Sequence, residues 1–227
     1  MLASTGHIVD SDAFPFQSTT FPAMSQTGAY SPNHVYTHAD VKEVIKYAAA
    51  RGIRVLPEFD TPGHVLKGWE SSGLLTDCYA ADGTTKTGTG PLNPTLNETY
   101  TYLSAFYAEI HKLFPDKFVH VGGDEVPADC WQSNPQVTKW MKAQSPPLTS
   151  FADLETLYEQ KLLDILKDQG TSCKFTSKLP LLVMHGPTMR AELIGHFKAC
   201  MTDIYLHIDA RVADYIRTHP YVDRLRL

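Results

Sequence analysis

The sequence predicts an α/β fold, namely a partial (β/α)8 barrel of parallel strands. Between residues 36 and 169, amphipathic helical segments alternate with short apolar strands, an order typical of a parallel sheet or barrel. Polar segments follow directly after apolar strands, which is where a barrel places its active-site loops. The chain has 227 residues, whereas a complete barrel takes about 250, so we expect only part of one.

Composition and charge narrow the classes of partner. Hydrophobic residues make up 43% of the chain, enough to build one sizeable core. The net charge of −5 argues against a nucleic-acid partner. No apolar run approaches the ~18 residues of a membrane span, and no signal-peptide pattern is visible at the start of the chain. The four cysteines leave the redox compartment open.

The first helix and the strand after it have clear boundaries. Thr37 with Asp40 predicts a capped helix start, and Gly52 is well placed to end that helix. Its predicted buried stripe consists of Val41, Val44, Ile45 and Ala48. Residues 53–59 then predict a buried strand, because they are almost continuously apolar. Pro57 is tolerated in this strand because it lies near the strand's end.

The middle of the chain combines a predicted long loop with a strong helix. Residues 65–92 are rich in glycine, threonine and serine and predict a loop. Asn93 followed by Pro94 predicts the cap and first turn of the next helix. Its apolar stripe consists of Leu96, Tyr100, Leu103, Tyr107, Ile110 and Phe114. Three further elements are predicted, a strand over 118–121 and helices over 135–143 and 151–169.

Adjacent carboxylates, Asp124 and Glu125, follow the strand over 118–121 after two glycines. Two acids side by side repel, so we expect their pKa values to split and one acid to hold a proton near neutral pH. Polar segments also occur at residues 7–10 and 60–64. Since successive strand ends of a barrel converge on one pocket, we expect the three segments to meet. Taken singly, each has an ordinary alternative, either a solvated acid pair or a structural loop residue.

Three motifs resemble the β-N-acetylhexosaminidases of glycoside hydrolase family 20. They are HIVD at residues 7–10, RGIRVLPEFDTPGH at 51–64 and HVGGDEV at 120–126. The resemblance implies that residues 7–170 are part of a catalytic (β/α)8 barrel. It also implies an enzyme, needing no metal or cofactor, that removes terminal β-linked N-acetylglucosamine or N-acetylgalactosamine from oligosaccharides and glycoconjugates. A chitinase-type barrel is disfavoured, because the acidic motif DxxDxDxE is absent from the sequence.

The resemblance implies a role for each polar residue. Glu125 looks like the general acid that protonates the glycosidic oxygen. Asp124 looks like the carboxylate that orients and charge-stabilises the 2-acetamido group of the substrate. His64 resembles the histidine that hydrogen-bonds within the acid's network, and Asp10 the active-site aspartate that supports this histidine. His120 matches a motif position at which we expect a structural role.

The spacing of the two acids is consistent with substrate-assisted catalysis. Ordinary retaining glycosidases need two carboxyl groups about 5–5.5 Å apart on opposite sides of the sugar. Neighbouring residues on extended backbone point to opposite faces, so Asp124 and Glu125 do not suit that arrangement. One acid and one helper suit a retaining mechanism in which the substrate's own acetamido oxygen attacks the anomeric carbon. Family 20 is a recognised exception of this kind.

The resemblance also implies covalent features of the secretory pathway. Cys78 and Cys130 match a family disulfide closing a loop of 52 residues, a length for which chain entropy gives about 4 kcal/mol. Two buried free thiols are the alternative. Asn97 opens a glycosylation sequon at a site that the family also uses. These features favour a lysosomal or secreted glycoprotein, and the family often forms homo- or heterodimers.

The resemblance ends near Gly170. Residues 171–227 form a divergent tail in which no motif of the family is found. No tryptophan follows Trp140, although the family lines its sugar pocket with tryptophans from later strands. We therefore expect a barrel truncated at both ends, with weak or no activity of its own. The competing hypothesis is a non-catalytic isoform that binds glycans or partner subunits, for which replacement of Glu125 would change nothing.

Overall fold

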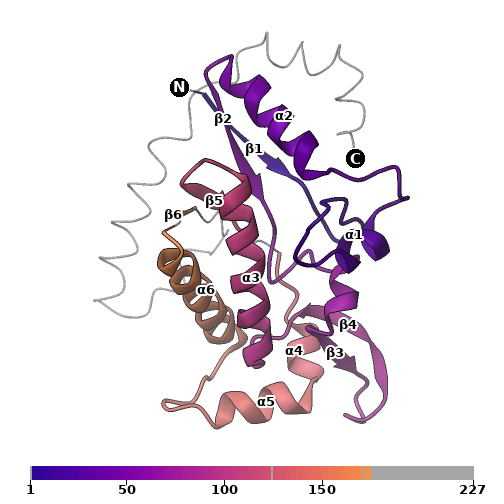
Figure 1. Ribbon diagram of the computed structural model, residues 1–227. Helices are drawn as coiled ribbons and strands as arrows, with labels where there is room; N and C mark the ends of the chain where they lie inside the picture. The colour runs from indigo at the N-terminus through magenta and orange to yellow at the C-terminus, as the bar shows by residue number, and fades with distance from the viewer. Residues whose placement is uncertain (1, 124, 171, 175–227) are drawn as a thin grey trace.

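The computed structural model describes residues 2–123, 125–170 and 172–174, and contains a parallel sheet whose strands run in the order β1-β2-β5-β6 (Figure 1). The strands are β1 (Leu2–His7), β2 (Ile53–Glu58), β5 (Phe118–His120) and β6 (Ser172–Lys174). Each neighbouring pair is parallel. The predicted α/β class is therefore confirmed. The polar sequence of β1 did not predict a strand, and its regular register against β2 accounts for it.

A helix precedes each of the strands β2, β5 and β6, as expected where parallel strands are joined by crossovers. These helices are α2 (His38–Ala49), α3 (Asn97–Leu113) and α6 (Phe151–Asp168). The predicted capping box of α2 is present, since Thr37 and Asp40 exchange hydrogen bonds between side chain and backbone. Gly52 has a φ of +71°, suited to the residue that follows a helix end. Val41 and Ala48 of the predicted stripe are buried, whereas Val44 is 47% exposed, so its predicted burial was wrong. Pro57 is the second-last residue of β2, as expected.

Two predictions for the middle of the chain were wrong. Residues 65–92 are largely regular, with the 3-10 helix η1 (Trp69–Ser72) and an antiparallel hairpin of β3 (Leu75–Tyr79) and β4 (Lys86–Leu92). Its strands lack an apolar alternation, and contacts with α4 (Asp129–Ser133) support them. The helix after the hairpin begins at Asn97, with Leu96 as its cap. Asn93 is not the cap, because its side chain accepts hydrogen bonds from Thr95 in a local turn.

Two short helices complete the described part of the chain. They are α1 (Ala23–Gly28) and α5 (Pro135–Lys142), the second of which was predicted. In Figure 1, β1 and β2 point toward the end of the molecule that carries the β3–β4 hairpin, α4 and α5. This end is therefore the carboxyl end of the parallel strands, and helices α3 and α6 lie side by side along the sheet.

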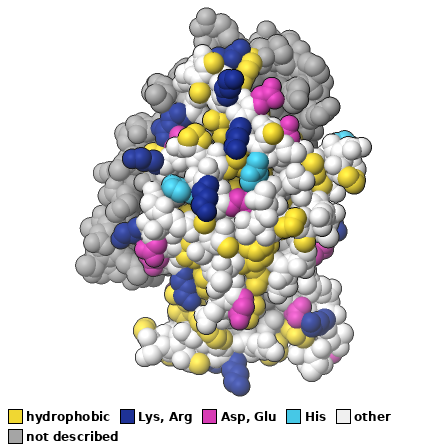
Figure 2. Space-filling model, viewed as in Figure 1, with side chains coloured by type: hydrophobic (Ala, Val, Ile, Leu, Met, Phe, Trp, Pro, Cys, Tyr) yellow, Lys and Arg dark blue, Asp and Glu magenta, His cyan; other side chains and the backbone are white. Residues whose placement is uncertain are grey.

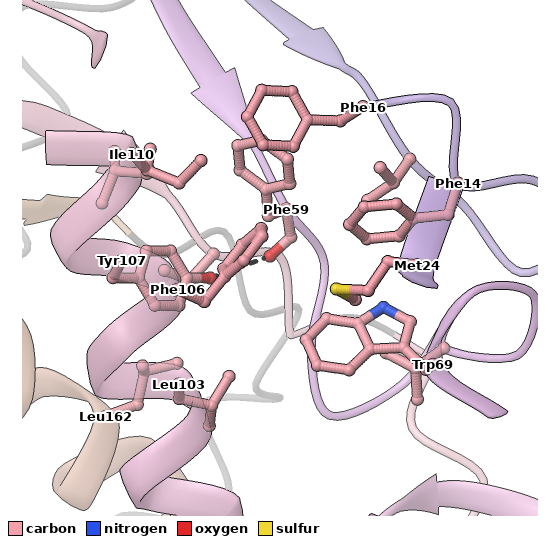
Figure 3. Close-up of a cluster of buried hydrophobic side chains, with 14 of the residues drawn as sticks. Phe14, Phe16, Met24, Phe59, Trp69, Leu103, Phe106, Tyr107, Ile110 and Leu162 are labelled. Atoms are coloured by element: carbon pink, nitrogen blue, oxygen red, sulfur yellow. Dashed lines mark hydrogen bonds between the residues drawn. The ribbon is translucent and has the colours of Figure 1, made fainter. Parts of the chain in front are cut away.

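Aromatic side chains fill the core between the sheet and helix α3 (Figure 3). Phe16, Phe59 and Phe106 meet edge to face, with ring centroids 5.1–6.3 Å apart, a favourable arrangement for aromatic pairs. The Tyr107 hydroxyl donates to the Phe59 carbonyl oxygen at 3.1 Å, shown as the dashed line in Figure 3. Helix α3 is thus tied to the chain directly after β2, where the strand passes into its loop.

A buried glutamate joins α3 to a distant loop. Glu109 is 7% exposed and accepts hydrogen bonds from the Ser18 hydroxyl at 2.7 Å and from the backbone of Thr19 and Thr20 at 2.6 and 3.1 Å. His38 Nε2 lies 2.8 Å from the same carboxylate. Burial opposes ionisation of Glu109, but the hydrogen bonds outweigh it and lower its pKa to about 2. The carboxylate therefore stays charged at any physiological pH.

Candidate active site

Three polar residues lie just beyond the carboxyl ends of neighbouring parallel strands. Asp10 follows β1, His64 follows β2 and Glu125 follows β5. Because β2 lies between β1 and β5 in the sheet, His64 is expected between the other two. In a (β/α)8 barrel this end of the strands holds the catalytic groups.

The imidazole of His64 contacts both carboxylates. Its Nδ1 lies 3.0 Å from Asp10 Oδ1, and its Nε2 lies 3.7 Å from Glu125 Oε2. When Nδ1–H donates to Asp10, the lone pair of Nε2 is directed toward Glu125. The 3.7 Å separation is longer than a direct hydrogen bond and within the range of an ion pair. The three residues thus form a chain of polar contacts that can orient a proton on Glu125.

Asp10 is the charged end of this chain of contacts. Burial opposes its ionisation, but hydrogen bonds from the Ser11 backbone N–H and from His64 outweigh that effect, so the pKa of Asp10 is lowered. The side chains of Asp10 and Glu125 are 56% and 65% exposed, and that of His64 is 27% exposed. The site therefore lies open to water as the structure describes it.

The backbone around the site is held in left-handed conformations. Glu125 and His64 have φ values of +52° and +51°, and Gly122 and Gly123 have values of +67° and +100°. A non-glycine residue in this region costs of order 1–3 kcal/mol and persists only where the surroundings fix it. Such strain clusters at functional sites, and here it occurs at two of the three residues brought together.

Asp60 is one of the groups that fix the turn before Glu125. Its side chain is buried at 3% exposure, and its Oδ1 accepts the N–H of Gly123 at 2.8 Å. A Cβ on Gly122 would collide with the Asp60 carboxylate, so only glycine fits there. Asp60 was predicted to lie in the polar loop over 60–64, but no role was predicted for it. Its function of holding the glycine turn depends on contact between two strand ends.

A second support lies on the strands themselves. A structural role was expected for His120, but its partner Glu58 was not predicted. Glu58 and His120 end strands β2 and β5, are register partners and are 5% and 4% exposed. His120 Nδ1 lies 3.0 Å from Glu58 Oε1, and 3.2 Å from the backbone nitrogen of Gly122. Charged residues are almost never fully buried without a partner, so the buried Glu58 in an apolar strand was the available signal.

The disulfide implied by the family resemblance, between Cys78 and Cys130, is present. It ties strand β3 to helix α4, which follows Glu125 closely in the chain. Two hydrogen bonds reinforce this contact, from Trp131 Nε1 to the Leu92 carbonyl oxygen at 3.1 Å and from Asn134 Nδ2 to the Asp77 carbonyl oxygen at 3.0 Å. The hairpin after His64 and the segment after Glu125 are therefore held together.

Other predicted features lie apart from the site or outside the described residues. Asn97 is exposed at the start of α3, and the buried Thr99 hydroxyl of its sequon donates to the Asn93 carbonyl oxygen. Asp124 lies outside the described residues, as does the predicted tail over 171–227 apart from residues 172–174. Asp124 therefore keeps only the role that its motif predicts.

The surface of the described residues carries charge of both signs. On the face seen in Figure 2, basic and acidic side chains of the described residues are interspersed, without a patch of one sign. Across the parts of the chain that the structure describes, no helix is both long and apolar enough to span a bilayer.

Comparison with known families identifies the segment that carries the site. Residues 6–176 match the model of the glycosyl hydrolase family 20 catalytic domain. The chain is 53% identical over 161 residues to β-hexosaminidase subunit beta of Homo sapiens, covering 70% of this chain and 29% of that protein. It is 51% identical over 166 residues to subunit alpha of Rattus norvegicus, covering 71% and 30%. The chain thus spans about three tenths of these relatives.

Solved structures give the same correspondence at the level of the fold. A chitobiase of Flavobacterium johnsoniae superposes with a TM-score of 0.64 at 25% identity, over 77% of this chain and 26% of that chain. An exo-β-N-acetylglucosaminidase of Vibrio harveyi in complex with N-acetylglucosamine gives the same TM-score at 24% identity, over 77% and 30%.

Proposed function

Since this chain belongs to glycosyl hydrolase family 20, we propose that it is a catalytic part of a β-N-acetylhexosaminidase. The proposed reaction is the removal of terminal β-linked N-acetylhexosamine from oligosaccharides and glycoconjugates. The observation that carries the proposal is the contact of His64 with both Asp10 and Glu125, at 3.0 and 3.7 Å. This geometry brings together one residue from each of the three motifs of the sequence.

Glu125 is the proposed general acid. Protonation of the departing glycosidic oxygen needs a carboxyl group whose proton is directed and held. His64 is placed to do this, because its Nε2 faces Glu125 while its Nδ1 is fixed by Asp10. Glu125 gives its proton to the leaving oxygen, and His64, fixed by Asp10, holds the carboxyl group in place while it does so.

Asp124 is the proposed helper of a retaining, substrate-assisted reaction. In this mechanism the acetamido oxygen of the substrate attacks the anomeric carbon while Glu125 protonates the leaving oxygen. Asp124 would orient the acetamido group and stabilise the positive charge that develops on it. The support for its role is its place in the HVGGDEV motif, directly before Glu125.

We propose that the chain alone is weakly active or inactive. The side chains of Glu125 and Asp10 are more than half exposed,. Water at a site weakens the electrostatic interactions on which acid catalysis depends. In the relatives, the remaining seven tenths or so of the protein would cover this site and exclude water from it. The relatives' names describe subunits, so we further propose a homo- or heterodimeric, glycosylated protein of the lysosome or the extracellular space, with Asn97 as a glycan site.

Hydrolysis of nitrophenyl N-acetyl-β-glucosaminide and N-acetyl-β-galactosaminide tests the proposal. The assay compares the chain with Glu125→Gln and with Glu43→Gln, an exposed glutamate on α2 that serves as a matched control. Activity that is lost in Glu125→Gln and kept in Glu43→Gln supports the proposed acid. Activity that is equal in all three proteins refutes it. Sugar binding that is unchanged by Glu125→Gln, without hydrolysis by folded protein, would instead favour a glycan-binding module.

A further inference from the structure

The turn that carries Glu125 rests on a buried pair that the reaction itself does not use. His120 Nδ1 contacts the backbone nitrogen of Gly122 at 3.2 Å and Glu58 Oε1 at 3.0 Å. Glu58 and His120 are opposite each other in the register of β2 and β5, so their side chains leave the sheet on the same face. Both are almost fully buried, and Gly122 lies only three residues before Glu125.

Nδ1 of His120 thus contacts two groups that require opposite protonation states of this nitrogen. The Gly122 N–H can only donate, so Nδ1 must offer it a lone pair. An ionised Glu58 carboxylate can only accept, and would need a proton on that same nitrogen. Only an Nδ1 without a proton can hold Gly122, so the state of this nitrogen decides whether the contact fixes the turn.

We propose that Glu58 and His120 form a positioning pair for the turn that carries the catalytic acid. Nδ1 of His120 accepts the N–H of Gly122, and the Glu58 carboxyl group lies against the same ring from the neighbouring strand. The Gly122–Gly123 turn is thereby fixed, so that Glu125 stays within reach of His64. This inference rests on the proposed function, and it assigns to that function two residues that touch neither the substrate nor the reacting atoms.

The conformation of the turn explains why such a pair is needed. Gly122, Gly123 and Glu125 all have positive φ. Because glycine restricts its own backbone less than other residues do, hydrogen bonds to the turn are needed to fix its conformation. Asp60 holds the N–H of Gly123, and His120 holds that of Gly122. A displacement of a catalytic group by about 1 Å can reduce a rate ~100-fold, so a loose turn would impair a correctly folded site.

The first test uses the unmodified chain and does not depend on hydrolysis. Nitrogen NMR of labelled protein reports whether His120 Nδ1 carries a proton, and a scalar coupling across the hydrogen bond joins Nδ1 to the amide nitrogen of Gly122. The proposal expects an unprotonated Nδ1 with this coupling. A protonated Nδ1, or an unprotonated one without coupling to Gly122, overturns it.

Variants then separate positioning from packing. His120→Phe fills the space of the ring without an acceptor, and amide exchange at Gly122 should become about tenfold faster, as for the loss of one hydrogen bond. His120→Asn restores an acceptor, since an Asn side chain can accept the N–H two residues on, and exchange should slow again. Glu58→Gln removes the group that could draw a proton onto Nδ1, so Gly122 should stay at least as well protected as in the unmodified chain. Equal exchange in all these proteins, or no recovery in His120→Asn, contradicts the proposal.

Hydrolysis provides an independent arm that distinguishes the two proposals. Where the chain is active, His120→Phe should lower kcat about 100-fold with a much smaller change in KM, and His120→Asn should recover part of kcat. Coupling between His120 and Gly122 in a chain that does not hydrolyse would refute the proposed catalysis and leave the positioning pair intact. Hydrolysis without the coupling would support the proposed catalysis and refute the positioning pair.

Discussion

The buried carboxylate of Glu109 gives the sharpest prediction about stability. Glu109→Gln keeps the size of the side chain but removes its charge and turns one acceptor into a donor that faces other donors. The hydrogen bonds to Glu109 lower its pKa from the usual 4.5 to about 2. At 1.36 kcal/mol per pKa unit, this shift corresponds to a contribution of about 3 kcal/mol to the free energy of unfolding. Because the residue is 7% exposed, little of this is lost to solvent screening.

The pH dependence of this contribution has a definite sign. The folded pKa lies below the unfolded one, so the contribution is fully present above pH 4.5 and disappears as the pH falls toward about 2. Urea unfolding, followed by circular dichroism, should therefore show the unmodified chain about 3 kcal/mol more stable than Glu109→Gln at both pH 7 and pH 5. The difference should shrink below pH 4.5.

The exposed Glu43 of α2 provides the control. Glu43→Gln should change the free energy of unfolding by less than about 0.5 kcal/mol, as surface substitutions usually do. A Glu109→Gln variant as stable as the unmodified chain at pH 7 would refute the reasoning. A loss of stability that stays the same down to pH 2 would also refute it, because it would show that packing and not charge is responsible.

Three further predictions concern other parts of the structure. Burial, together with the neighbouring Glu155, raises the pKa of Glu159 to about 7, so the free energy of unfolding should fall as the pH rises from 4.5 through 7. In urea unfolding, Glu159→Gln should remove this fall, and a pH profile unchanged by the substitution would contradict the prediction. Replacing Cys78 and Cys130 together by serine should lower the unfolding free energy by about 4 kcal/mol for a loop of 52 residues, and a loss below 1 kcal/mol would show that the hairpin contacts alone suffice. Gly122→Ala should cost at least about 2 kcal/mol, because its φ is +67° and its Cβ would meet Asp60. Gly52→Ala, where nothing lies within 4 Å, should cost only about 1 kcal/mol, and equal losses in the two variants would exclude a role for the contact with Asp60.

Local patterns in the sequence were sufficient to predict the helices α2, α3, α5 and α6, although not the start of α3, and they did not predict α1 or α4. The capping box of Thr37 and Asp40 uses residues three positions apart, and the apolar stripes of α3 and α6 repeat within each helix. The hairpin β3–β4 could not be predicted in this way. Its strands carry few apolar residues, and its supports, Cys130 and the rest of α4, lie far along the chain.

In the candidate site, too, residues within local motifs could be predicted, whereas residues that meet only in the folded chain could not. Asp10, His64 and Glu125 could be proposed because each lies in a recognisable motif, and the structure brings them together. The partners of Glu109 lie about 90 residues away, so nothing in the helix that contains it distinguishes it from a solvated residue. Glu58 and His120 meet only through strand register. Residues that act by holding others are therefore the ones that sequence patterns reveal least.

The disulfide between Cys78 and Cys130 also determines what a protease can do to this chain. Residues 84–89, at the end of the turn between β3 and β4 and the start of β4, form an exposed stretch that is a suitable site for cleavage. A cut there would fall inside the covalent ring closed by the disulfide, so the piece with His64 and the piece with Glu125 would remain joined. The nicked protein would migrate as one species on a non-reducing gel and as two after reduction. In a compartment rich in proteases, the two halves of the site would thus survive a break in the chain between them.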